Sequence, residues 1–144
     1  MAAYLGFDIG TVALANLTLQ TIAYLILILG FVIAKKKRFQ KHKKVMAAAT
    51  LLNFISLFVV MLPVFYSLVY GISLPAISTT NTIVIIHHSI GLITLALASV
   101  VILKSCALIK NTKLLMLTIF TLWSITYLLG VAIYLTFYTS LLPI

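Results

Sequence analysis

Three histidines are the side chains of this 144-residue chain best suited to chemistry. His87 and His88 are adjacent within an apolar stretch, whereas His42 lies in a run of lysines. Because an imidazole inside a bilayer is costly and is usually kept for a function, all three are candidate haem or metal contacts. The sole acidic residue, Asp8, lies near the N-terminus, so a hydrolytic dyad or triad cannot be assembled. We therefore expect a protein that is not an enzyme.

Helical geometry limits how these histidines could act together. Adjacent residues on a helix point about 100° apart, so His87 and His88 cannot bind one iron from opposite faces. We expect at most one of them to face inward with Gly91, and the other to face lipid, a partner subunit or the membrane interface. His42 is separated from His87 by more than about 20 Å of helix rise, which excludes a shared haem iron. A haem held by one histidine, with an open or Met61 sixth position, remains as an alternative. A metal site is less favoured, because metals need several convergent ligands.

The composition requires a lipid environment. Hydrophobic residues make up 64% of the chain and charged residues only 8%, which is too apolar for a soluble domain of this length. A bilayer core is crossed by about 20 apolar residues in a helix. We predict one domain over residues 1–144, with transmembrane helices at about 9–34, 45–70, 82–103 and 114–137. The single cysteine, Cys106, excludes an internal disulfide, and we expect it to be a small buried residue.

The net charge of +9 indicates topology rather than a nucleic-acid partner. Seven of the ten basic residues lie in Lys35–Lys44 and the other three in Lys104–Lys113, whereas the middle link, Gly71–Asn81, has none. Because basic links remain in the cytoplasm, we predict that both of these turns are cytoplasmic and that both termini are outside the cell membrane. We also expect the turns to contact anionic lipid head groups.

Short links make consecutive helices antiparallel neighbours, so we predict an all-α, up-down four-helix transmembrane bundle. Pro63 is expected to kink the second helix. Small and polar residues mark helix contacts within membranes, and they recur here at alternating steps of three and four residues. The predicted packing residues and polar core are Asn53, Ser56, Gly91, Trp123, Tyr127, Gly130 and Tyr134, with Asn16, Gln20 and Tyr24 on the first helix.

Two stretches carry a resemblance to a known family. KKKRFQKHKKVMAAATLLNF contains a basic turn followed by His42 and Met46, and KNTKLLMLTIFTLWSITYLLGVAIYL contains a W-x3-Y-x2-G-x3-Y pattern that begins at Trp123. Together with the histidine at 87 or 88, they resemble a family of small four-helix membrane proteins that includes the oxidase-maturation protein CtaM and its YozB-like relatives. The relatives have a further histidine where this chain has Asn111-Thr112-Lys113, which argues against a multi-histidine haem site.

The resemblance implies a role in maturing haem–copper terminal oxidases, by handling haem. We therefore expect a small membrane helper, or haem-associated protein, of a respiratory complex. The alternative is a non-catalytic accessory subunit of a larger membrane enzyme, because the chain lacks the acids and soluble loops that an autonomous activity would use. A transporter is less favoured, since transporters carry intramembrane acids or broken helices near mid-membrane.

Overall fold

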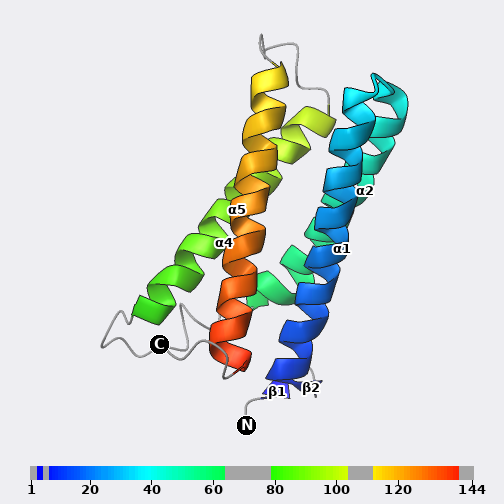
Figure 1. Ribbon diagram of the computed structural model, residues 1–144. Helices are drawn as coiled ribbons and strands as arrows, with labels where there is room; N and C mark the ends of the chain where they lie inside the picture. The colour runs from blue at the N-terminus through cyan, green and yellow to red at the C-terminus, as the bar shows by residue number, and fades with distance from the viewer. Residues whose placement is uncertain (1–2, 5–6, 64–78, 104–111, 140–144) are drawn as a thin grey trace.

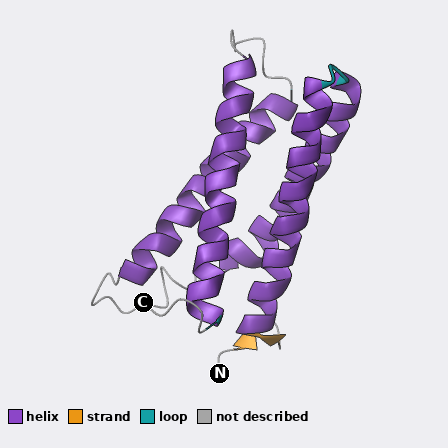
Figure 2. Ribbon diagram, viewed as in Figure 1, coloured by secondary structure: helices purple, strands orange, loops and turns teal. Residues whose placement is uncertain are grey.

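The computed structural model describes residues 3–4, 7–63, 79–103 and 112–139, and nearly all of them are helical (Figures 1 and 2). The long helices are α1 (Ile9–Lys35), α2 (Phe39–Ser56), α4 (Thr79–Ile102) and α5 (Thr112–Tyr138), and a π-helix, η1 (Leu57–Met61), continues α2. Two short strands, β1 (Ala3–Tyr4) and β2 (Phe7–Asp8), pair antiparallel just before α1. They do not change the class of the fold, which is all-α.

The four long helices form a ring in which each packs mainly against two others. The contacting pairs are α1 with α2, α2 with α4, α4 with α5, and α5 with α1. Figure 1 shows that α1 begins and α5 ends at one end of the bundle, whereas α1 ends and α2 and α5 begin at the other. This arrangement confirms the predicted antiparallel up-down four-helix bundle.

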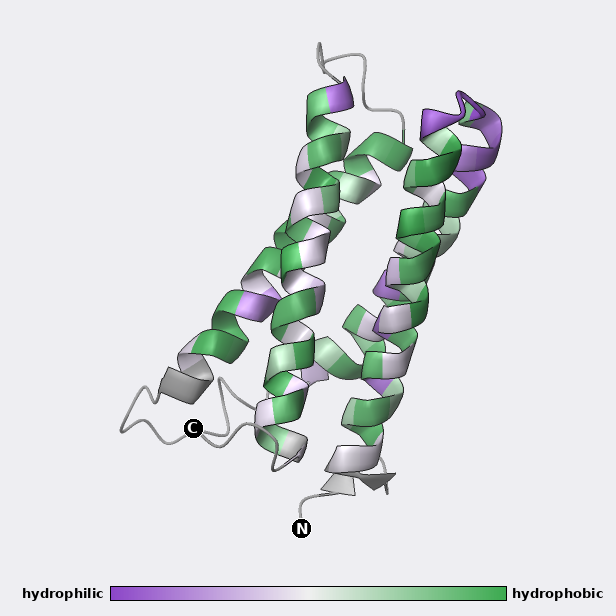
Figure 3. Cartoon of the chain, viewed as in Figure 1, coloured by the Kyte–Doolittle hydropathy of each residue, from purple (hydrophilic) through white to green (hydrophobic). Residues whose placement is uncertain are grey.

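All four helices are long and apolar enough to cross a membrane. The candidate spans are Gly10–Lys35, Phe39–Met61, Thr82–Ile102 and Lys113–Phe137, with mean hydropathies between 1.9 and 2.3. Large apolar side chains face outward: Leu25, Leu51 and Leu128 are 60%, 61% and 64% exposed. Figure 3 shows hydrophobic residues along all four helices and hydrophilic ones gathered where α1 meets α2. The chain is therefore a multi-pass membrane protein.

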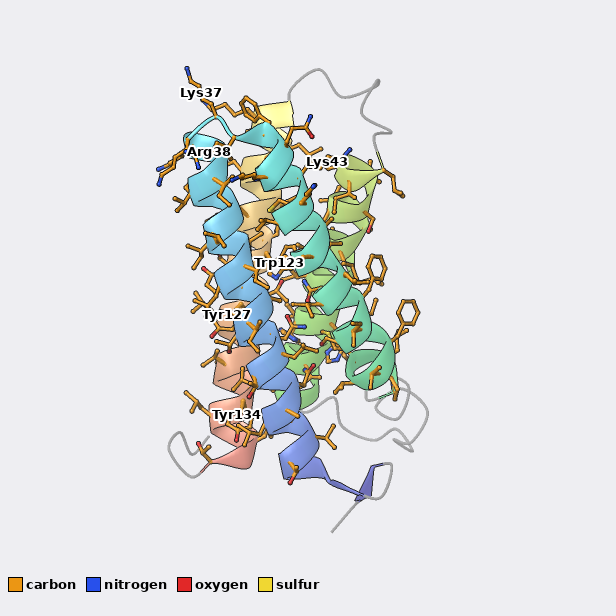
Figure 4. All side chains as sticks on the ribbon, turned by 90° about the vertical axis from the view of Figure 1, so that its right-hand side faces the viewer. Lys37, Arg38, Lys43, Trp123, Tyr127 and Tyr134 are labelled. Carbon is orange, nitrogen blue, oxygen red and sulfur yellow. The ribbon has the colours of Figure 1, made fainter. Side chains whose placement is uncertain are left out.

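The turn between α1 and α2 is much shorter than predicted. The expected link ran from Lys35 to Lys44, but α2 begins at Phe39 and only residues 36–38 lie between the helices. Lys37 takes a positive φ of 56°, and the His42 N–H donates to the Arg38 carbonyl at 3.0 Å. Lysine is a good helix former whose charged head can extend to water, so a basic run does not end a helix. Lys37, Arg38 and Lys43 gather at this end of the bundle, termed the basic end (Figure 4).

The sequence predicts a kink at Pro63, and the structure has a π-helix, η1, that ends two residues before this proline. Proline has no N–H, and its ring collides with the carbonyl four residues earlier, here that of Val59. Widening the turn over Leu57–Met61 relieves this conflict, as π-bulges commonly do within long helices. Residues 64–70 of the predicted second helix, Cys106, and most of the predicted links Gly71–Asn81 and Lys104–Lys113 lie outside the described residues.

The core lies in the half of the bundle nearer the basic end and draws on all four helices. Its buried members are Leu27, Ala49, Ala98, Ile119 and Trp123. Ala49 and Ala98, on α2 and α4, are 0% and 3% exposed, and their small side chains let the helix backbones approach closely. Trp123 is only 2% exposed, so its large ring fills the space that these alanines leave.

Candidate functional site

His42 joins α2 to α1 near the basic end. Its Nδ1 lies 2.8 Å from the Gly30 carbonyl, so Nδ1–H donates to that oxygen and fixes the ring. A Cβ atom on Gly30 would lie 2.8 Å from Met46 Sδ, one turn beyond His42, so the two helices meet closely at this glycine. The ring is half-buried. Of the three histidines, His42 is the one that links the first two helices.

His87 faces α5. A Cβ atom on Gly130 would lie 3.2 Å from His87 Cε1 and 3.8 Å from its Nε2, and the ring also lies near the backbone of Thr126. Within the described part of the chain, the buried Nδ1 of His87 has no hydrogen-bond partner. Burying such an atom without a partner costs free energy, so His87 is the histidine with unused bonding capacity.

His88 faces η1, the continuation of α2, instead. Its Nδ1 lies 2.8 Å from the carbonyl of Val84, one turn earlier on α4, and its ring lies against the backbone of Met61 at the end of η1. The His87 and His88 rings meet edge to face, with centroids 5.3 Å apart and planes at 84°. The expectation that only one histidine faces the bundle is therefore wrong, because α4 has two neighbours in the ring and each histidine contacts one of them.

Gly91, one turn beyond His87 on α4, lies close to both α5 and η1. A Cβ atom there would lie 3.3 Å from Thr126 Cγ2 on α5 and 3.7 Å from Met61 Cε. We call His87, His88, Met61 and Thr126 the histidine cluster; it draws on α4, η1 and α5. The half-buried Tyr134 lies on the next turn of α5 beyond Gly130 (Figure 4).

Polar contacts between α1 and α5 involve two stacked tyrosines. The rings of Tyr24 and Tyr127 have centroids 4.5 Å apart and planes at 14°. The Tyr24 O–H donates to Ser124 Oγ at 3.1 Å, and Tyr127 OH lies 3.1 Å from Thr21 Oγ1. Since the Thr21 hydroxyl already donates to the Leu17 carbonyl, Tyr127 is the donor. The sequence predicts both tyrosines as packing residues but not Thr21 and Ser124, which lie three residues before Tyr24 and Tyr127.

A short hydrogen bond joins the first half of α1 to α2. Ser56 is fully buried, and its hydroxyl donates to Asn16 Oδ1 at 2.5 Å. Asn53, which the sequence predicts in the same polar stripe, is half-buried one turn earlier on α2. Within a membrane such contacts hold helices together, because lipid competes poorly for polar groups.

This packing does not fit a haem held inside the bundle. His42 lies near the basic end and His87 near the other, so they cannot hold one iron between them. Since a Cβ atom on Gly130 would lie only 3.8 Å from His87 Nε2, and α4 and α5 also meet at Gly91 and Thr126, a porphyrin on that nitrogen would have to push these helices apart. Within the ranges that the structure describes, no group of three His, Cys, Asp or Glu side chains could hold a metal ion.

Taken together, the fold and its polar contacts define a small multi-pass membrane protein whose described histidines lie at helix–helix contacts. Comparisons with known protein families, with curated proteins and with solved structures give no match to this chain.

Proposed function

We propose that this protein is a small, non-catalytic helper of a larger respiratory membrane complex, a terminal oxidase. The observation that supports this proposal is how its described polar side chains are used. His42, Ser56, Tyr24 and Tyr127 all form hydrogen bonds between helices, while the outward faces are apolar. A protein built in this way acts on what lies beside it in the bilayer. The family resemblance of the basic turn, the second helix and the fourth helix suggests the oxidase as the partner.

The proposed orientation follows from the basic end. Lys35–Lys44 and Lys113 lie at the same end of the bundle, as expected if both basic turns face the cytoplasm and contact anionic head groups. The start of α1 and the end of α5 then lie on the outer side of the cell membrane. The histidine cluster lies in the outer half of the bilayer, where a partner subunit could contact it.

Deleting the gene tests this proposal. We expect membranes without the protein to lose spectroscopically visible terminal oxidase and its oxygen consumption, and both to return when the chain is supplied again. Oxidase content and respiration equal to those of the parent strain would contradict the proposal. Native gel migration after extraction in a mild detergent distinguishes two versions of the proposed function. An accessory subunit migrates with the oxidase, whereas an assembly helper migrates separately.

Haem association is a second candidate, favoured by the buried, unpartnered Nδ1 of His87. In the present packing α4 and α5 leave no space for a porphyrin beside that ring, so haem contact requires these helices to separate. The test is a reduced-minus-oxidised spectrum of the purified chain, with and without added haem, beside His87→Leu. Spectra without a Soret or α band, together with no uptake on titration, would remove haem from the proposal.

A further inference from the structure

A small apolar cavity lies at the basic end among α1, α2 and α5. Its volume is about 30 Å³, and it is lined by Leu27, Phe31, Met46, Met116, Ile119 and Phe120. The rings of Phe31 and Phe120 stack with centroids 5.0 Å apart and form one of its walls. Phe31 is 36% exposed, so this wall reaches the surface of the bundle. An apolar cavity of this kind favours hydrocarbon over water.

Lysines stand above this wall on both helices. Lys35 Nζ lies 4.8 Å from the centre of the Phe31 ring, which it covers. On α5, the exposed Lys113 precedes Phe120 by seven residues, which places it about 10 Å closer to the end of the bundle. The same helix rise places Lys35 about 6 Å beyond Phe31. Both lysines are therefore terminal residues of candidate membrane spans, and both lie beyond the apolar wall toward the end of the bundle.

The chain cannot neutralise these lysines with its own acidic side chains. It has ten basic residues and one acidic residue, Asp8, which precedes α1 and so lies at the opposite end of that helix from Lys35. The counter-charge must come from outside the chain. Basic sites between transmembrane helices on the cytoplasmic side are the usual places where anionic lipid head groups bind.

We infer that the crevice between α1 and α5 at the basic end is a binding site for one anionic phospholipid. Its phosphate pairs with Lys35 and Lys113, and its acyl chain lies along Phe31 and Phe120 with one segment in the cavity. The inference rests on the proposed contact of the basic turns with anionic head groups, and it gives that contact a defined place. The partner complex is not involved.

The single tryptophan is a built-in reporter for this site, because Trp123 belongs to the same core cluster as Leu27 and Ile119, which line the cavity. The purified chain is reconstituted in phosphatidylcholine vesicles that contain either phosphatidylglycerol or phosphatidylcholine brominated on the acyl chain, at equal mole fraction. Bromine quenches tryptophan at short range. We expect the brominated anionic lipid to quench Trp123 more strongly than the brominated zwitterionic lipid does. Two lysines, at about 1 kcal/mol each, correspond to about a thirtyfold higher affinity of the site for the anionic lipid.

The matched variants are Lys35→Gln with Lys113→Gln, and Lys37→Gln with Arg38→Gln, which remove the same charge from different places. We expect the first pair to abolish the excess quenching and the second to retain it. If the stronger quenching by the anionic lipid persists in the Lys35→Gln, Lys113→Gln variant, the lipid site in the crevice is contradicted, although the basic end would still attract anionic lipids in general. Equal quenching by both brominated lipids in the unmodified chain would overturn both.

Discussion

The imidazole of His87 lies directly against Gly130, with Cε1 3.2 Å from where a Cβ atom would stand. One turn away, Gly91 and Thr126 repeat the contact between the same two helices at 3.3 Å. Both contacts are close, so α4 and α5 meet where a glycine on one helix faces a side chain on the other. The packing of these helices in the outer half of the bundle therefore depends on a glycine facing a histidine.

Substituting Gly130→Ala is expected to destabilise the bundle by about 1–3 kcal/mol, the usual cost of adding a methyl group to a filled contact. The same substitution in a His87→Ala background should cost far less, because the atom that the new methyl meets has been removed. Unfolding in mixed detergent, followed by Trp123 fluorescence, measures the four members of this cycle. Strictly additive effects would show that the two residues do not share a contact.

Removing the Ser56 hydroxyl should loosen α2 from α1. We expect Ser56→Ala to lower the free energy of unfolding by about 0.6 kcal/mol and at most about 1.7, the range of hydrogen bonds between membrane helices. The control is Thr118→Ala on the exposed face of α5, whose hydroxyl bonds only to the Leu114 carbonyl within the same helix. Equal losses from the two variants would contradict a special role for the bond to Asn16.

The two parts of the Tyr127 contact can be separated by two substitutions. Tyr127→Phe removes the hydroxyl that donates a hydrogen bond to Thr21 but keeps the ring stacked on Tyr24. The free energy of unfolding should therefore fall by about 0.6 kcal/mol. Tyr127→Leu removes the stack as well, which should cost about 0.5–1.5 kcal/mol more. The measurement is again detergent unfolding. If the two substitutions lower the free energy of unfolding equally, the ring stacking does not contribute to stability.

The proposed orientation predicts which engineered cysteines can be labelled from each side. In a Cys106→Ser background, Lys37→Cys and Lys113→Cys should react with a membrane-impermeant maleimide only after the cells are opened. Thr11→Cys, at the far end of α1, should react on intact cells. Labelling in the reverse order would invert the topology, although the four-helix fold would be unaffected.

The sequence predicted the position of most helical boundaries, but it misplaced the start of the second helix. Apolar length sets a transmembrane span, so the sequence predicts a link over the charged run that begins at Lys35. Lysine does not break a helix, and α2 extends through the run as far back as Phe39. The stripe of small and polar residues on this helix identified His42 and Ser56, but their partners, Gly30 and Asn16, were not assigned because nothing local identifies a contact across two helices.

The sequence alone determined the membrane as solvent, the number of spans and their alternation, because apolar length and basic links depend only on local composition. The tertiary structure decided how the two adjacent histidines are used. On an isolated helix, His87 and His88 differ only by a turn of about 100°. The ring of four helices places α5 beside one and α2 beside the other, so His87 rests on Gly130 while His88 lies against Met61.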